Sequence, residues 1–212
     1  MENTTMENTR TKTTRNSLIL LLTAAIWGMA FVSQSKGMDY MHPFTFNGVR
    51  SLIGAASILV YILISRKIAG DKAAPLDWKL NVKAGLLCGI FLTIASTLQQ
   101  FGIKYTSVGK AGFITTLYII FVPMFGIFLK KKVAPVVWAA AVMAAVGMYL
   151  LCMTESLRLG AGDIMVFLCA IAFAIQIMTV DHYAARIDGA VVSCIQFTVC
   201  GVVCCIGALI WG

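Results

Sequence analysis

Long apolar runs, separated by short polar connections, fill almost the whole chain. The hydrocarbon core of a bilayer is roughly 30 Å thick, and a helix needs about 20 apolar residues to cross it. Backbone in that core must be helical or belong to a closed barrel, and barrel strands would alternate apolar and polar residues, which these runs do not. The pattern therefore predicts seven membrane-spanning helices, over Ser17–Val32, Phe44–Ile64, Ala84–Gly102, Ala111–Leu129, Ala134–Met153, Asp163–Val180 and Gly189–Trp211.

Composition supports the same fold class. Apolar residues make up 59% of the 212 residues and charged residues only 12%, whereas soluble domains carry about 25% charged residues. We therefore expect an all-α, polytopic membrane helix bundle, and the composition excludes a soluble globular domain.

The first sixteen residues, Met1–Asn16, are polar and repeat Met-Glu-Asn-Thr at positions 1 and 6. We expect a disordered cytoplasmic tail. A cleaved signal peptide is the alternative interpretation, but the following apolar run contains Trp27 and offers no convincing small-residue cleavage site.

Basic residues predict the orientation of the chain, because short loops rich in Lys and Arg remain on the cytoplasmic side. Twelve of the 17 basic residues lie in the N-terminal segment and in every second loop after it. Four lie in the opposite loops, and Arg50 lies within a predicted span. The N-terminus is thus predicted to be cytoplasmic, and the net charge of +8 is explained by topology, without a nucleic-acid partner.

Catalytic and metal-binding chemistry finds little support in the sequence. The seven cysteines all fall in predicted spans without a Cys-x-x-Cys spacing, and the chain has two histidines, so the cysteines are expected to serve helix packing. The nine acidic residues lie in loops or at span ends, so no carboxylate relay for protons is identified. We expect neither an enzyme nor a bound cofactor or metal. Gly85 and Gly89 form a small-xxx-small pair that would allow close helix approach.

Polar and aromatic residues recur at helical spacing within the spans. Trp27, Phe31 and Gln34 fall at i, i+4 and i+7, and Asn47 and Arg50 share a face with Pro43. Such stripes favour a common interior, although hydrogen bonds between helices explain Ser and Thr equally well. Arg50 differs, because a charge at mid-depth costs about 2.5 to 3.5 kcal/mol. Its partner is either a set of carbonyls near the helix start or an anionic ligand.

Several short motifs occur together in a recognisable order. Trp27-Gly28 and Phe31 come first, followed by Pro43 and Arg50, and then by Tyr105-Thr106-Ser107 opening a helix with Pro123. Leu129 and a basic run then precede a helix bearing Gly147. In this order the chain resembles the EamA-type domain of the drug/metabolite transporter superfamily over Ser17–Trp211. One departure is Lys130–Lys132, where relatives often carry Gly-Glu-Arg-like residues.

The resemblance implies ten helices in two five-helix repeats of inverted topology, with a central cavity between them. An offset of about 146 residues between the repeats pairs Pro43 with Gly189 and Arg50 with Gln196. The implied organisation is a polar tail at 1–16, a first repeat at 17–153 and an incomplete second repeat of two helices at 162–212. Three helices would be missing after Gly212.

The function implied by the resemblance is secondary transport, expected here as export of small organic metabolites or drugs by alternating access. The expected partners are the lipid bilayer of the plasma (inner) membrane, a small-molecule substrate, a coupling ion and a second copy of the chain. Two alternatives stay open: a truncated, non-transporting membrane fragment, or a subunit completed by another chain. By analogy, nine residues would line the substrate cavity: Trp27, Phe31, Gln34, Asn47, Arg50, Gln100, Thr116, Gln176 and Gln196.

Overall fold

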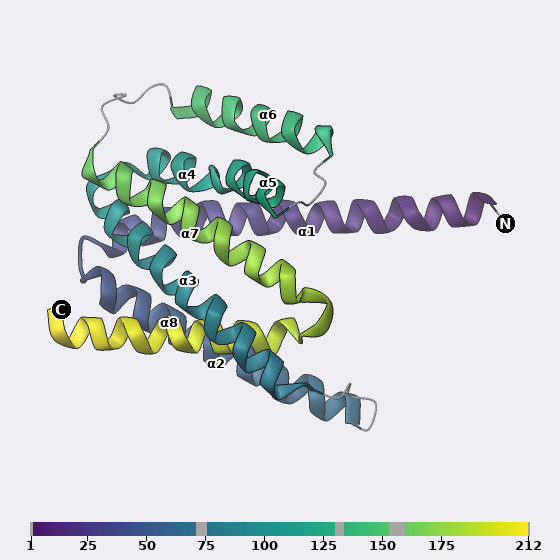
Figure 1. Ribbon diagram of the computed structural model, residues 1–212, viewed down its shortest axis with the longest axis horizontal. Helices are drawn as coiled ribbons and strands as arrows, with labels where there is room; N and C mark the ends of the chain where they lie inside the picture. Colours follow the sequence, from purple (N-terminus) through teal and green to yellow (C-terminus); the bar gives the residue numbers. More distant parts are fainter. Residues whose placement is uncertain (1, 71–75, 130–133, 153–159, 212) are drawn as a thin grey trace.

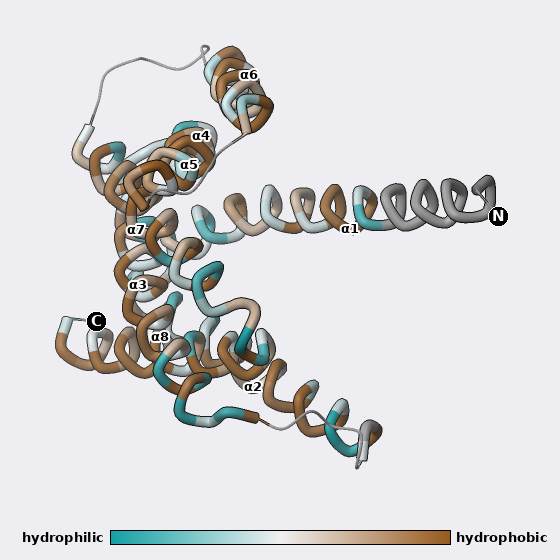
Figure 2. The backbone as a smooth tube through the Cα atoms, turned by 45° about the vertical axis from the view of Figure 1, so that its right-hand side comes forward, coloured by the Kyte–Doolittle hydropathy of each residue, from teal (hydrophilic) through white to brown (hydrophobic). Residues whose placement is uncertain are grey.

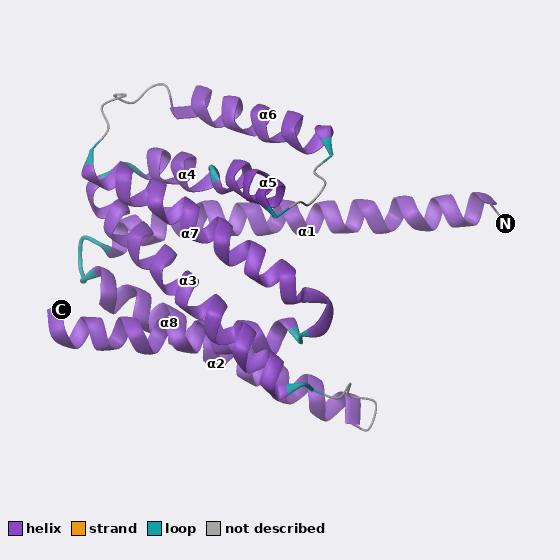
Figure 3. Ribbon diagram, in the orientation of Figure 1, coloured by secondary structure: helices purple, strands orange, loops and turns teal. Residues whose placement is uncertain are grey.

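The computed structural model describes residues 2–70, 76–129, 134–152 and 160–211, and within these ranges every regular element is helical (Figure 3). The all-α prediction is therefore confirmed. The elements, in chain order, are α1 (Glu2–Gly37), α2 (Pro43–Ala69), α3 (Trp78–Tyr105), α4 (Val108–Thr116), α5 (Tyr118–Phe128), α6 (Pro135–Cys152), α7 (Ala161–Tyr183), the 3-10 turn η2 (Ala184–Arg186) and α8 (Gly189–Trp211).

Six helical segments of the described chain are long and apolar enough to cross a membrane: Asn16–Gly37, Pro43–Ile68, Trp78–Tyr105, Val108–Phe128, Ala161–Arg186 and Gly189–Trp211. They correspond to six of the seven predicted spans. The remaining span, predicted over Ala134–Met153, coincides with α6, whose apolar stretch Pro135–Gly147 is shorter. The chain is a polytopic membrane helix bundle.

The expectation of a disordered N-terminal tail is wrong, because α1 already begins at Glu2. Residues 1–16 contain neither Pro nor Gly, so nothing in them terminates a helix that extends backwards from the first span.

Local side-chain caps explain where several helices begin. Pro43 occupies the first turn of α2, and the Phe44 amide donates to Nδ1 of His42 at 3.4 Å. Asp77 accepts from the Leu80 amide at 3.1 Å before α3, and Ser107 accepts from the Lys110 amide at 3.2 Å before α4. These bonds satisfy donors that have no partner within the helix.

The fourth predicted span is divided at Leu117 into α4 and α5. The Thr116 hydroxyl donates to the Gly112 carbonyl at 2.7 Å, a back-bond that bends helices. Pro123, within α5, has no amide hydrogen, and its ring crowds the carbonyl of Ile119. Both features loosen the helix on either side of Leu117.

In the bundle, α2 lies along α8, while α3 packs against both α7 and α8 (Figure 1). Helices α4 and α5 cover α7 on the opposite side, with α6 outside them. The span Asn16–Gly37 of α1 is the least buried of the six. Figure 2 shows α1 leaving the bundle toward its N-terminus, with its C-terminal end near the other helices.

Glycines allow the closest helix contacts around α3. A Cβ atom on Gly85 would lie 2.7 Å from the Ile195 side chain of α8, and one on Gly89 would lie 2.8 Å from Val199. The predicted role of this glycine pair in close packing is thus confirmed. Together with buried Ala84, Cys88 and Val192, this contact forms one apolar core of the molecule.

Candidate substrate cavity

Two of the predicted cavity residues meet where the last turns of α1 and α3 lie together. Gln100 is fully buried, and its Nε2 donates to the Gln34 backbone carbonyl at 3.3 Å. The Gln34 side chain is 5% exposed. Neither Oε1 atom of these two amides has a hydrogen-bond partner among the described residues. The site therefore presents two buried acceptors without donors.

A second pair lies on α2. Nη2 of Arg50 donates to Oδ1 of Asn47 at 2.8 Å, one helical turn away, and the guanidinium carbon lies 5.6 Å from the Phe46 ring centroid. The partner of Arg50 is thus a side-chain amide of its own helix, a third arrangement beside the two expected. Asn47 is fully buried, and its Nδ2 has no partner in the described structure.

The third pair joins α7 to α8. Gln176, 9% exposed, donates from Nε2 to Oε1 of Gln196 at 3.0 Å. This bond connects the two helices that the repeat plan assigns to the second half.

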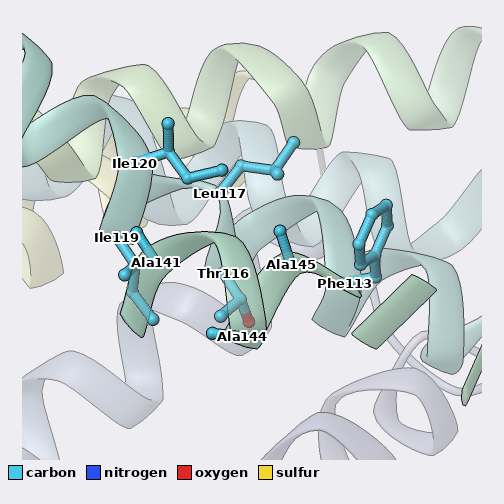
Figure 4. A pocket seen from close by; sticks show the side chains of 8 residues that line it. All are labelled: Phe113, Thr116, Leu117, Ile119, Ile120, Ala141, Ala144 and Ala145. Carbon is cyan, nitrogen blue, oxygen red and sulfur yellow. The ribbon is translucent and has the colours of Figure 1, made fainter. Parts of the chain in front are cut away.

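Three predicted residues lie apart from these pairs. Trp27 is 51% exposed on the projecting part of α1, while Phe31 packs against the core cluster around Ile103 and Val166. Thr116 lines a cavity of about 10 Å³ between α4, α5 and α6 (Figure 4), together with apolar residues that include Leu117 and Ala141. That volume holds no more than one water, so this cavity cannot contain a substrate.

Sequence reasoning did not select a hydroxyl and thiol cluster between α2, α3 and α8. The Ser51 hydroxyl donates to the Cys200 sulfur at 3.4 Å, and the Ser96 oxygen lies 3.4 Å from the same sulfur. Thr97 and Cys204 form a similar contact at 3.7 Å. Ser96, Thr97 and Cys200 occupy polar stripes, but nothing in the sequence alone pairs one stripe with another.

Two polar junctions, also missed from the sequence, link the predicted repeats at opposite ends of the bundle. At one end Asp163 of α7 accepts from the Thr106 hydroxyl and lies 3.8 Å from the Lys110 ammonium. At the other end the Asp188 amide donates to Oδ1 of Asn81 at 2.9 Å, and its carboxylate lies 3.8 Å from Arg66.

A larger groove lies between α3, α5 and α7. Its volume is about 490 Å³, and its walls are apolar except for the polar groups of Thr179, His182 and Tyr183. None of the nine predicted cavity residues lines this groove.

Metal-ligating side chains do not gather in the described part of the chain: it contains no group of three His, Cys, Asp or Glu residues placed to hold an ion. The six cysteines with described side chains are free thiols.

Comparison with known proteins identifies the family of the chain. The model of the EamA-like transporter family matches residues 15–153. The chain belongs to this family. An "Uncharacterized transporter" from Archaeoglobus fulgidus is 31% identical over 171 residues, which cover 78% of this chain and 48% of that protein. The chain thus spans about half the length of this relative. No solved structure matches the chain.

Membership in the EamA-like transporter family, together with six apolar helices of spanning length, makes the protein a multi-pass integral membrane protein of a transporter family. A lipid bilayer is the environment that helices of this length and composition require.

Proposed function

We propose that this protein is a secondary transporter, not an enzyme, which exports small organic metabolites or drugs across the plasma membrane by alternating access. The observation that carries the proposal is the set of three buried, unpaired polar atoms on α1, α2 and α3: Oε1 of Gln34, Nδ2 of Asn47 and Oε1 of Gln100.

Unpaired buried groups are expensive, because each costs about 1–3 kcal/mol when it loses water without gaining a partner. In a transporter that cost has a use, since a passing substrate can supply the missing partner. The two glutamine oxygens can accept from donors of a substrate, and the Asn47 amide can donate to an acceptor. Phe31, about one turn before Gln34 on α1, would provide apolar contact, whereas Trp27 lies on the projecting part of that helix.

The positions of α7 and α8 support an inverted repeat. With the offset of about 146 residues, the first turn of α2 at Pro43 corresponds to the first turn of α8 at Gly189. The span of α1 corresponds in the same way to α7. Because each repeat has an odd number of helices, the second repeat crosses the membrane in the opposite orientation to the first. Rocking of one repeat against the other then opens a site between them to one side of the membrane at a time.

The test compares two neighbouring glutamines. Gln100 has an unpaired Oε1, whereas Gln99, which is also buried, donates to the Thr115 hydroxyl at 3.2 Å. A thermal-shift screen of the purified chain first identifies a stabilising ligand, because a ligand that binds the folded state raises the unfolding temperature. Uptake of that ligand into inside-out vesicles then measures export.

We expect Gln100→Leu to abolish the ligand-induced shift and the uptake. Like Gln99→Leu, it also loses one buried hydrogen bond, so the ligand-free variant should be somewhat less stable than the wild type. Gln99→Leu should lower stability and retain the shift. Equal ligand affinity in wild type and Gln100→Leu would contradict the assignment of this site. If uptake persisted without a pH or Na⁺ gradient, transport would not be coupled to either ion. Chemical cross-linking of the protein in membranes tests whether two copies of the chain associate.

A further inference from the structure

The groove between α3, α5 and α7 lies at one end of the bundle. Leu87 belongs to the first half of α3, Phe128 is the last residue of α5, and Tyr183 is the last residue of α7. By the charge pattern of the loops, all three helix ends face the cytoplasm. The groove thus belongs to the cytoplasmic half of the membrane.

Its walls indicate an apolar occupant. Phe125, Ile175 and Met178 line the groove, and its volume of about 490 Å³ falls within the range of small-ligand sites, about 300–1,000 Å³. The groove is open at the side, where Phe128 is 79% exposed and Leu129 is 64% exposed, so the bilayer itself has access to it.

The cytoplasmic rim is polar and basic. His182 and Tyr183 line the end of the groove, and the exposed Arg186 follows in η2. The exposed Lys83 lies one turn before Leu87 on the same face of α3. Two acidic residues lie at this end of the bundle, Asp181 beside His182 and Asp188, whose carboxylate lies 3.8 Å from Arg66. The cations Lys83, Arg186 and Arg66 outnumber these two carboxylates.

We infer that this groove binds an anionic phospholipid of the cytoplasmic leaflet, with an acyl chain between α3, α5 and α7 and the phosphate near Lys83 and Arg186. Basic pockets between helices on the cytoplasmic side suit such headgroups. The inference goes beyond transport, because none of the proposed cavity residues lines the groove.

The test is native mass spectrometry of the purified chain with phosphatidylglycerol or phosphatidylcholine of identical acyl chains. Wild type should retain phosphatidylglycerol preferentially. Lys83→Gln with Arg186→Gln should reduce that retention roughly fivefold per cation. The matched control is Lys36→Gln with Lys104→Gln, which removes two exposed cations near the opposite helix ends and should change nothing.

A second pair of variants tests the apolar part of the site. Leu87→Trp fills the groove and should lower the retention of both lipids, whereas Leu86→Trp places the same ring on an exposed neighbouring position and should not. Leu87→Phe replaces Leu87→Trp if the latter fails to fold by circular dichroism.

Three results would overturn the inference. The first is equal retention of the two lipids by wild type, and the second is equal loss in the rim and control pairs. The third is equal retention of both lipids by Leu87→Trp and Leu86→Trp, because the acyl chain would then not occupy the groove.

Discussion

Asp163 is a buried carboxylate whose oxygens are engaged by neighbours from different parts of the chain. The Gly160 amide donates to Oδ2 at 2.9 Å, and the Thr106 hydroxyl donates to Oδ1 from the connection between α3 and α4. We predict that Thr106→Val lowers the free energy of unfolding by about 1.5–3 kcal/mol, because a hydrogen bond to a charged group is lost in a buried site. Thermal unfolding in detergent measures the change.

Thr106→Ser is the matched control for this prediction, since it retains the hydroxyl and should remain close to wild type. If Thr106→Val and Thr106→Ser unfolded at the same temperature, the junction at Asp163 would contribute nothing to stability.

Asn47 and Arg50 form a pair of a different kind, in which a buried amide accepts from an exposed guanidinium. We predict that Asn47→Ala destabilises the protein by about 1.5 kcal/mol, the low end for a hydrogen bond to a charged group, because Arg50 is exposed. Asn47→Asp, which keeps an acceptor and adds a charge, should recover most of the loss. Chemical unfolding in mild detergent measures the free energy of unfolding of each variant. If Asn47→Asp were less stable than Asn47→Ala, this pairing would be excluded.

At this scale the sequence predicted which polar residues lie inside but not which of them have partners. Gln99 and Gln100 are adjacent and both buried, yet one amide meets Thr115 and the other leaves an oxygen unpaired. The difference depends on the rotation of α3 against α4 and α1, and helical periodicity alone does not determine that rotation.

Among the elements, glycine positions decide how closely helices approach. Gly85 lies so near Ile195 that a methyl group would stand 2.7 Å from its side chain, whereas nothing lies within 4 Å of Gly28. We predict that Gly85→Ala destabilises the bundle by about 1–3 kcal/mol through overpacking. Gly28→Ala should be neutral or stabilising by up to about 1 kcal/mol through helix propensity. The unfolding temperatures of the two variants, measured side by side, check this prediction. If Gly28→Ala unfolded at a lower temperature than Gly85→Ala, the close packing of α3 on α8 would be refuted.

Apolar length predicted the spans because the bilayer imposes one requirement on every crossing helix. Details within a span depend on weaker effects. The break at Leu117 arises from the Thr116 back-bond and from Pro123, both visible in the sequence, but their combined effect depends on the helices packed around them. The helix over residues 2–16 escaped prediction because polarity indicates exposure to water rather than loss of helical structure.

For the molecule as a whole, the pairing of distant segments carries the architecture. Helix α8 lies along α2, although their starts are separated by most of the chain, and the repeat offset relates these two helices to each other. A helix that contacts its own repeat counterpart lies next to the axis relating the two halves. In the proposed inverted repeat, relative motion of the two halves would be centred on the interface of α2 and α8, which contains the Ser51–Cys200 contact.

The orientation of the whole bundle gives the last prediction. Tyr40, 86% exposed, lies in the turn between α1 and α2, and the exposed Ala185 lies between α7 and α8. With the basic loops inside, Tyr40→Cys should react with a membrane-impermeant maleimide in intact cells, and Ala185→Cys should react only after permeabilisation. The wild-type chain, whose cysteines all fall in predicted spans, provides the background. If Ala185→Cys were labelled in intact cells and Tyr40→Cys were protected, the predicted topology would be wrong. The basic rim of the groove would then lie on the outer side of the membrane.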